Sequence, residues 1–393
     1  MYSLSPSHTM KRYDWKRILR TNIIKLKIVG LWPSGDDSYK PNIYTLWAIS
    51  SITFLNFGHN FFQMVNMIFI FDNLHAVIKT TYVTLSEVAG LLKAYYVVRN
   101  MKTLKELMVI LSSDTFQPKN ARQIKMVKPS FFFWRVNYVM YWLMSGGAIF
   151  FWSVYPILDK SVKEYPLPFL AWYPWYTKAS PMYELTYLYQ IFGLLFIAIT
   201  AISVDTLIAA LNVYIGAQFD ILCDDIKHLF DPGSPSEGFN GKLIDIIKHH
   251  REIIRFAANT NKFANWIVLA QFFTSAVTIG ITLFQMTVVV PFSSEFFSCL
   301  SFTFSMTVEI FMYCWFGNEV EVKSSNVVYT VFESNWLDTS MEVKKNMMFF
   351  VMRCQKPVKM SALDLFYLSL DTFMRILRTA WSYFALLHQV SSR

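Results

Sequence analysis

Long stretches without a charged residue most constrain what this chain can fold into. The 31 residues from Pro41 to Phe71 contain no Lys, Arg, Asp or Glu, and neither do the 32 residues from Phe263 to Ser294. A helix needs about 20 apolar residues to cross the hydrocarbon core of a bilayer. Charged residues make up only 16% of the chain, against about 25% in an ordinary soluble domain. The sequence therefore predicts a polytopic membrane protein and excludes a soluble enzyme, a disordered chain and a disulfide scaffold.

Seven segments are candidate transmembrane helices by length and polarity, which predicts an all-α membrane protein. Five are almost free of charge: Ile43–Phe71, Val136–Leu158, Leu185–Leu211, Phe263–Val290 and Phe296–Trp315. Two more carry charges: Leu74–Val98 contains Lys79, Glu87 and Lys93, and Leu363–Val390 contains Asp371, Arg375 and Arg378. Because charged side chains inside a span usually face protein or water, we interpret these two as inward-facing helices of a bundle.

The spacing of the charges in the last segment predicts specific pairs. Asp371 and Arg375 are four residues apart, so they share a helical face and we expect an ion pair between them. Arg378 is expected to contact a carboxylate or backbone carbonyls of a neighbouring helix. Glu309, the one carboxylate in Phe296–Trp315, is a candidate partner for such an arginine.

The distribution of Lys and Arg between the loops predicts the orientation. The segments on the side of the N-terminus contain 27 of them, against three in Asp159–Met182 on the other side. Because basic residues concentrate in cytoplasmic loops, the N-terminus is expected in the cytosol and the C-terminus outside the cell. This orientation, and the lack of Asp-Arg-Tyr and Asn-Pro-x-x-Tyr signatures, exclude a G-protein-coupled receptor.

These assignments divide the chain into four regions. We expect a cytosolic N-terminal segment over residues 1–40 and six helices over 41–316. A cytosolic anchor segment follows over 317–362, into which helices extend, and the last helix covers 363–393. Asp231–Gly241 is the clearest flexible insertion, because it is rich in Pro and Gly. Asp159–Pro181, rich in Pro, Trp and Tyr, is expected to form a structured outer lid.

No pattern in the chain indicates catalysis or metal binding. The four cysteines lack metal-ligand spacing such as Cys-x-x-Cys, and we interpret them as buried or reduced thiols. The polar residues within the spans include no paired His or carboxylates at acid–base spacing, and His59 is interpreted as a packed or interfacial residue. We therefore predict no catalytic residue, no metal and no cofactor. The net charge of +9 lies in the loops, which argues against nucleic-acid binding.

Three motifs, in order along the chain, resemble insect odorant receptors. The run Tyr313-Cys314-Trp315-Phe316-Gly317-Asn318-Glu319, followed by Ser324, Tyr329 and Trp336, is similar to the end of that family's sixth helix and the loop after it. The run Phe373-x-x-Ile376-Leu377-Arg378-x-x-x-Ser382-Tyr383-Phe384-x-Leu386-Leu387 is similar to its final helix. Near the start, Leu26-Lys27-Ile28-Val29-Gly30-Leu31-Trp32-Pro33 is similar to its N-terminal segment. With the length and the topology, the resemblance covers essentially the whole chain.

The resemblance implies a multi-pass plasma-membrane protein of sensory neurons. It implies a ligand-gated, nonselective cation channel that is tetrameric and joins an odour-specific subunit to a shared co-receptor. The co-receptor has a much longer insertion than Tyr214–Lys262, so we interpret this chain as the odour-specific subunit. Its expected partners are that co-receptor, a small volatile ligand and membrane lipid.

The last helix is expected to line the pore. Thr379, Ser382, Leu386 and Val390 fall at spacings of three and four, flanked by Tyr383 and Gln389, so they share one face. The resemblance places the gate at Leu386 and an outer polar filter at Gln389. An apolar ring can block ions by excluding water.

The resemblance places the odorant pocket in the outer half of the bundle, between the second, third, fourth and sixth helices. Ser145-x-x-Ala148-x-x-x-Trp152 has a small, small, large spacing that opens a slot closed by an aromatic ring. The facing positions are Ile78, Tyr82, Gln190, Gly193, Ile197, Phe302 and Ser305. An apolar pocket of this kind suits a small volatile molecule bound mainly by burial.

Two other functions remain open from the sequence. A gustatory receptor of the same superfamily shares the topology, although Ser382-Tyr383 and His388-Gln389-Val390 match its last helix less well. A secondary transporter requires inverted repeats and broken helices, and neither is visible in the sequence.

Overall fold

The structure, a computed structural model, describes residues 12–35, 39–72, 74–158, 165–230 and 239–391. Helices occupy most of these residues, as the sequence predicts. The elements are α1 (Lys16–Ile28), α2 (Ile43–Ser50), a π-helical segment (Ser51–Phe57), α3 (Gly58–Phe69), α4 (Leu74–Arg99), α5 (Met101–Leu111), a 3-10 turn (Asp114–Phe116), α6 (Ala121–Leu158), α7 (Met182–Lys227), α8 (Phe239–Val288), α9 (Ser294–Glu333), a 3-10 turn (Trp336–Asp338), α10 (Met341–Cys354), β1 (Ser361–Ala362), β2 (Phe366–Tyr367) and α11 (Leu370–Ser391).

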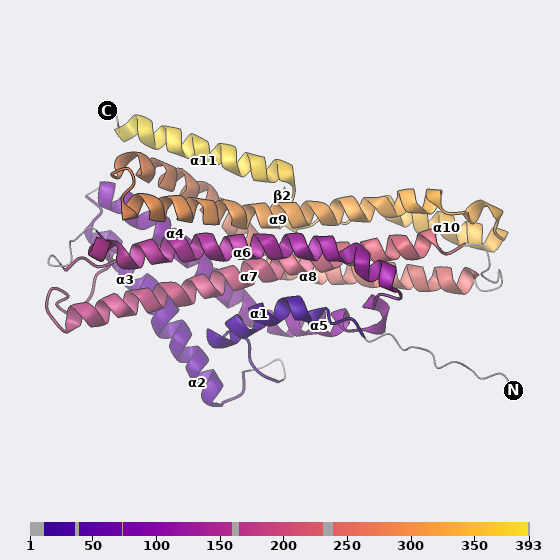
Figure 1. Ribbon diagram of the computed structural model, residues 1–393, viewed down its shortest axis with the longest axis horizontal. Coiled ribbons are helices and arrows are strands. Elements are labelled where there is room, and N and C mark those ends of the chain that lie inside the picture. The colour runs from indigo at the N-terminus through magenta and orange to yellow at the C-terminus, as the bar shows by residue number, and fades with distance from the viewer. Residues whose placement is uncertain (1–11, 36–38, 73, 159–164, 231–238, 392–393) are drawn as a thin grey trace.

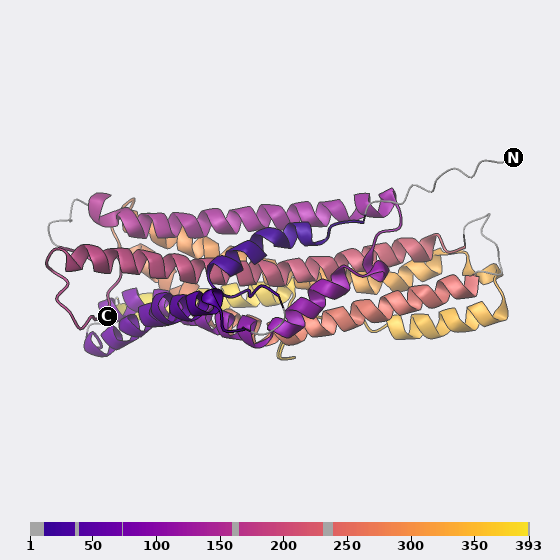
Figure 2. The same ribbon diagram turned by 90° about the horizontal axis from the view of Figure 1, so that it is seen from below.

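The long helices form an elongated bundle. In both views, α6, α7, α8 and α9 run along the same long axis (Figures 1 and 2). Helix α9 packs mainly against α6 and α7 and also contacts α8 and α11, while α8 packs mainly against α4 and α11. We call the end that holds residues 165–181 and 289–293 the loop end, at the left of Figure 1, and the end that holds α10 the anchor end, at its right.

Helix covers most of each predicted span, but the last helix begins at Leu370, after β1 and β2, rather than at the expected Leu363. Four of these helices run far beyond the predicted span. Three of them, α7, α8 and α9, are individually long and apolar enough to cross a membrane. Within α9, the helix continues through residue 317 as far as Glu333, so the expected start of the anchor segment falls inside one helix. Of the predicted flexible insertion and outer lid, residues 231–238 and 159–164 lie outside the described residues.

The first predicted span is not one regular helix. The π-helical segment Ser51–Phe57 separates α2 from α3, and Gly58 N–H donates to Thr53 O across its end. The Tyr189 hydroxyl of α7 donates to Phe54 O over 2.7 Å. Such π segments commonly bend a helix, and α2 leaves the bundle obliquely in Figure 1.

Gly30 ends α1 in a way that explains part of the N-terminal motif. Leu31 N–H donates to Leu26 O, and Gly30 N–H donates to Lys27 O. This is the hydrogen-bond pattern of a glycine helix stop, which requires a positive φ. Gly30 has φ +85°, and a Cβ there would lie 2.6 Å from Ala48 Cα. The glycine therefore sets both the turn and the close approach of α2.

Candidate ligand-binding site

Four aromatic side chains meet near the loop end, and we call them the aromatic partition. Tyr82 of α4, Trp152 of α6 and Phe302 of α9 have ring centroids 5.3 to 6.4 Å apart. Phe169, from the segment between α6 and α7, stands edge-on to Trp152 at 5.3 Å. Edge-on and tilted rings at these separations attract each other. All four side chains are buried, and cavities lie on two sides of them.

The inner cavity lies among α4, α6, α7 and α9 and has a volume of about 70 Å³. Its lining is mostly apolar, and the hydroxyls of Ser145 and Ser305 form a 2.6 Å hydrogen bond in its wall. The lining residues are Ser86, Glu87, Tyr141, Ser145, Ala148, Ile149, Trp152, Leu194, Ile197, Ala198, Ala201, Ile202, Phe302, Ser305 and Met306. A concave apolar site with a few polar groups is typical of small-molecule binding.

The outer cavity lies beneath the segment between α6 and α7 and has a volume of about 120 Å³. Tyr82, Trp152 and Phe169 of the aromatic partition line it. Its other lining residues are Gln63, Thr80, Val83, Leu167, Pro168, Leu170, Glu295 and Ser298. Residues 167–170 of the predicted lid therefore form part of the wall of this cavity.

The structure brings most of the predicted pocket residues together. Six of them line the inner cavity: Ser145, Ala148, Trp152, Ile197, Phe302 and Ser305. Tyr82 and Trp152 line the outer cavity. Three others, Ile78, Gln190 and Gly193, are not among the residues that line either cavity.

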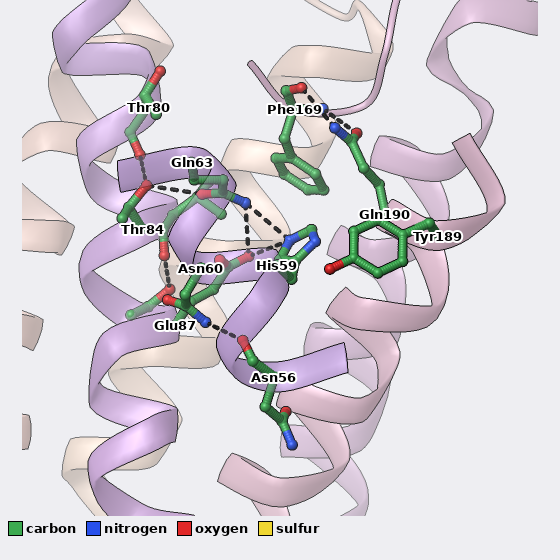
Figure 3. A network of polar contacts seen from close by, with 12 residues as sticks. Asn56, His59, Asn60, Gln63, Thr80, Thr84, Glu87, Phe169, Tyr189 and Gln190 are labelled. Carbon is green, nitrogen blue, oxygen red and sulfur yellow. Dashed lines mark hydrogen bonds and ion pairs between the residues drawn. The ribbon is translucent and has the colours of Figure 1, made fainter. Parts of the chain in front are cut away.

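Gln190 holds the lid segment instead of facing the cavity. Its Oε1 accepts from Phe169 N–H, and its Nε2 donates to Phe169 O, both at 3.0 Å. The same Nε2 also donates to the Tyr173 hydroxyl. This side chain pairs with the Phe169 backbone as a neighbouring strand would, so it positions one ring of the aromatic partition (Figure 3).

Gly193 makes room for the ring of His59. A Cβ at Gly193 would lie 2.9 Å from His59 Cγ and Nδ1. His59 is only 1% exposed, which confirms its interpretation as a packed residue. The absent side chain on α7 thus allows α3 to pack closely against it.

Sequence reasoning missed the polar network that His59 joins (Figure 3). His59 Nε2 lies 3.2 Å from Glu87 Oε1 and 2.9 Å from Gln63 Nε2. Gln63 Nε2 also donates to Glu87 Oε1 over 3.3 Å, and Thr84 donates to Gln63 Oε1 over 2.8 Å. The sequence signal was the carboxylate of Glu87 within a predicted span, which indicated an inward position but not its partners.

A second buried cluster ties four helices together beside the inner cavity. Lys93 Nζ of α4 lies 2.7 Å from Asp205 Oδ1 of α7 and 2.6 Å from Glu309 Oε1 of α9. Tyr141 of α6 donates to Asp205 Oδ2, and Tyr313 of α9 donates to Asp205 Oδ1. Since Tyr141 also lines the inner cavity, the cluster borders it.

This cluster corrects one prediction and confirms another. Glu309 pairs with Lys93 rather than with an arginine of the last helix, because α4 places an ammonium group beside it. Glu87 and Lys93 are 2% and 3% exposed, so both face inward as expected. The Lys79 side chain lies outside the described part of the structure.

The predicted pore residues of α11 are largely exposed in the single chain, although Tyr383 also lies beside Gly280 of α8. Thr372, Ile376 and Ala380 are the buried positions of this helix. Leu386 is 57% exposed, and the other expected pore residues, Ser382, Tyr383, Gln389 and Val390, are also exposed in the single chain. The predicted ion pair is present, with Arg375 Nη2 at 2.7 Å from Asp371 Oδ2.

The described residues contain no cluster of three or more His, Cys, Asp or Glu side chains that could hold a metal ion. Cys299, Cys314 and Cys354 are buried free thiols, and Cys223 is partly buried. What the site offers is an apolar enclosure with a few hydrogen-bonding groups, which suits binding rather than catalysis.

Comparisons with known proteins agree with this geometry. A family model described as 7tm Odorant receptor matches residues 73–381. Odorant receptor Or1 of Anopheles gambiae is 23% identical over 414 residues, and the match covers 97% of each chain. Odorant receptor 94a of Drosophila melanogaster is 22% identical, and the match covers 97% of this chain and all of that relative (100%).

Solved structures show the same fold. The olfactory receptor OR5 of Machilis hrabei, in complex with eugenol, superimposes with a TM-score of 0.84 at 18% identity. The superposition covers 96% of this chain and 98% of that chain. OR5 alone superimposes equally well, with a TM-score of 0.84 at 19% identity. The protein thus has the all-α, seven-helix membrane fold, its relatives are receptors rather than enzymes, and the chain belongs to the insect odorant receptor family.

Proposed function

We propose that this chain is the odour-specific subunit of a ligand-gated, nonselective cation channel in the plasma membrane of sensory neurons. It assembles there with a co-receptor into a heterotetramer. The observation that supports this proposal best is the inner cavity, which is lined by four helices and bordered by Trp152 and Phe302 of the aromatic partition. Membership of the odorant receptor family favours it over the gustatory receptor and the transporter.

The ligand is proposed to be a small, mainly apolar volatile molecule held in the inner cavity. The residues that bind the ligand there are Ser145, Ala148, Trp152, Ile197, Phe302 and Ser305. Tyr82 contacts the ligand as one ring of the aromatic partition. Burial of about 200 Å² of apolar surface contributes about 5 kcal/mol before the costs of association are subtracted. The outer cavity provides the way in, since it adjoins the same rings.

Opening is proposed to be a population shift. A ligand opens the channel only if it binds the open conformation more tightly than the closed one. Phe302 and Ser305 place the inner cavity against α9, and α9 contacts α11 through Phe311 and Phe373 at 5.6 Å. A displacement of α9 therefore reaches α11 directly, and copies of Leu386 around the central axis form the apolar gate with Gln389 outside it.

The proposed topology places the N-terminus and the anchor end in the cytosol and the C-terminus outside. It rests on the excess of Lys and Arg in the segments on the N-terminal side. Epitope tags at the two ends of the receptor test it in intact cells. Antibody should label a C-terminal tag on intact cells, but an N-terminal tag only after the cells are permeabilised. The reverse pattern would contradict the topology.

Substitution of Trp152 tests the binding site. Cells expressing the co-receptor with either the unchanged chain or W152A are recorded against an odour panel. The W152A response should shift to higher odorant concentrations, because the aromatic partition loses its central ring. Currents evoked through the co-receptor itself serve as the control and should persist. Equal loss of both responses would indicate misfolding, and an unchanged odour response would remove Trp152 from the site.

Substitution of Leu386 tests the gate. L386S should raise the resting current, because a polar ring no longer excludes water from the constriction. The matched control is L370S, the same change in the first turn of α11, which should leave the resting current unchanged. An unaltered leak in L386S would remove Leu386 from the gate.

A further inference from the structure

Glu87 is a buried carboxylate in the wall of the inner cavity. Glu87 is 2% exposed and is one of the residues that line that cavity. Within the described residues, all its polar contacts are on one oxygen, Oε1, which lies 3.2 Å from His59 Nε2 and accepts from Gln63 Nε2. Both partners come from α3 (Figure 3).

The second carboxylate oxygen has no such partner. Glu87 Oε2 is buried and makes no hydrogen bond to any described residue. Leaving a buried acceptor unpaired costs about 1–3 kcal/mol, and more for a charged group. Carboxylate oxygens only accept hydrogen bonds when ionised. The position therefore calls for a donor, and because Glu87 lines the inner cavity, a ligand there can supply one.

Two other residues of the lining supply a complementary group. The hydroxyls of Ser145 and Ser305 bond to each other at 2.6 Å. One O–H makes this bond, which leaves the other available to donate to a ligand oxygen. The cavity thus offers an acceptor at Glu87 and a donor at the serine pair, in an otherwise apolar lining. An alcohol or phenol satisfies both, whereas an aldehyde or ether satisfies only the serines and an ammonium group only Glu87.

We infer that the inner cavity is selective for odorants that carry a hydroxyl group, whose O–H donates to Glu87 Oε2. This inference rests on the proposed function and deepens it, since it names the chemical class of the ligand. The apolar remainder of the odorant lies against Trp152 and Phe302. A site built to pair a buried polar group rejects analogues that lack the matching group far more strongly than it rejects a missing methylene.

Binding of matched probes to the purified full-length receptor tests the inference. Two series of similar size differ only in hydrogen bonding: benzyl alcohol, benzaldehyde and ethylbenzene, and 1-octanol, octanal and nonane. Ligand-induced thermal stabilisation gives an apparent affinity for each. At least one alcohol should bind about tenfold or more tightly than its aldehyde. Aldehydes or hydrocarbons that bind as well as the alcohols, or alcohols that do not bind, would overturn the inference.

The E87Q variant tests whether Glu87 is the source of the preference. In E87Q the carbonyl oxygen keeps the Oε1 position, because Gln63 Nε2 donates there. The amide nitrogen then replaces Oε2 and presents a donor to the cavity. The alcohol-to-aldehyde affinity ratio should fall to one or below, while E184Q, the same change at an exposed glutamate of α7, should keep the ratio of the unchanged receptor. If E87Q folds and still prefers alcohols over aldehydes, a residue other than Glu87 is the source of the preference.

Two further readouts keep the outcomes separate. If E87Q does not fold, E87D decides, because it keeps the charge but withdraws the oxygen by one methylene and should weaken the preference. Binding is measured without the co-receptor, and currents are recorded with it. Odorant-evoked currents without a hydroxyl preference in binding would defeat this inference alone. A hydroxyl preference in binding without any odorant-evoked current would defeat the proposed channel alone.

Discussion

Gly193 and Gln190 lie on the face of α7 that the sequence assigned to the pocket, yet both serve the packing around it. Gly193 leaves space for His59, and Gln190 fixes the backbone of Phe169. Residue type and spacing do not distinguish a side chain that lines a cavity from one that shapes its wall. That distinction depends on which segment packs against the residue. Gly193 faces α3, and Gln190 faces the lid segment.

A methyl group at Gly193 should destabilise the receptor. The G193A Cβ would lie 2.9 Å from two atoms of the His59 ring, so the ring must move and its contact with Glu87 is disturbed. Overpacking of this kind costs about 1–3 kcal/mol. The matched control is G146A on α6, where nothing lies within 4 Å of the added Cβ. Thermal unfolding of the purified receptor should show a lower midpoint for G193A than for the unchanged receptor. The midpoint of G146A should not be lowered.

His249 should make stability depend on pH. Its side chain in the anchor-end half of α8 is 4% exposed and 2.9 Å from Gln218 Oε1, and burial lowers the pKa of His249 to about 3. An unfolded histidine has a pKa of about 6.5, so below pH 6.5 the unfolded state binds a proton that the folded state does not. Stability is therefore complete above pH 6.5 and is lost as pH falls toward 3.

Acidification from pH 7 to pH 5 should cost about 2 kcal/mol through this one group. The measurement is the unfolding midpoint at both values for the unchanged receptor and for H249Q, which keeps a donor for Gln218 but does not titrate. H249Q should show a smaller drop, and the remainder should come partly from His250, because burial lowers its pKa to about 4. Identical drops in the two proteins would contradict the assignment.

At the scale of elements, α11 depends on one glycine of α8. A Cβ at Gly280 would lie 2.7 Å from Tyr383 Cβ and 2.8 Å from Ala380 O, so this glycine sets how closely the two helices approach. The absent side chain thus lets α11 lie directly against α8, with no space left for a methyl group. Leu386, further along α11, stays exposed in the single chain.

G280A should reduce the current that an odorant evokes. The added methyl group would overlap Tyr383 and Ala380 of α11, so it must displace the proposed pore helix away from α8. Maximal current, recorded with the co-receptor, should fall while odorant binding to the purified receptor stays within about twofold, because Gly280 does not line the inner cavity. G241A, where nothing lies within 4 Å of the added Cβ, should leave both unchanged. An undiminished G280A current would contradict this displacement.

Over the whole molecule, the cluster around Lys93 joins α4, α6, α7 and α9 through buried polar contacts. One ammonium group faces the carboxylates of Asp205 and Glu309, and the hydroxyls of Tyr141 and Tyr313 complete the contacts of Asp205. Because an unpaired charge is costly inside such a bundle, the cluster restricts the helices to one mutual rotation. It also gives the inner cavity a fixed border.

Removal of the ammonium group should destabilise the whole bundle. K93M leaves two buried carboxylates without a cation, which costs about 3–5 kcal/mol. The double variant K93M/E309Q should recover part of that loss. K248M removes an exposed lysine that lies 3.2 Å from Asp245, and it should cost at most about 1 kcal/mol. Thermal unfolding compares the three, and equal midpoints for K93M and K248M would contradict a role for the cluster.

Several particular features could be predicted from the sequence because they depend on local pattern. The seven helical segments follow from runs of apolar residues, and the Asp371–Arg375 pair follows from their four-residue spacing. Six of the residues expected in the pocket from the resemblance line one cavity in the structure; their contact with a ligand stays a prediction. The π-helical interruption at Ser51–Phe57 could not be predicted, because it depends on the Tyr189 hydroxyl that α7 brings to Phe54 O.

The sequence by itself determined that this chain is a multi-helix membrane protein, since insertion into lipid depends on the length of an apolar run and the absence of charge. Only the tertiary structure decided that Lys93 rather than an arginine pairs with Glu309, and that Glu87 turns one oxygen to His59 and leaves the other unpartnered. Successive residues turn by about 100° around a helix axis. A small change in rotation therefore brings a different residue to face each neighbour, and only the packed bundle sets that rotation.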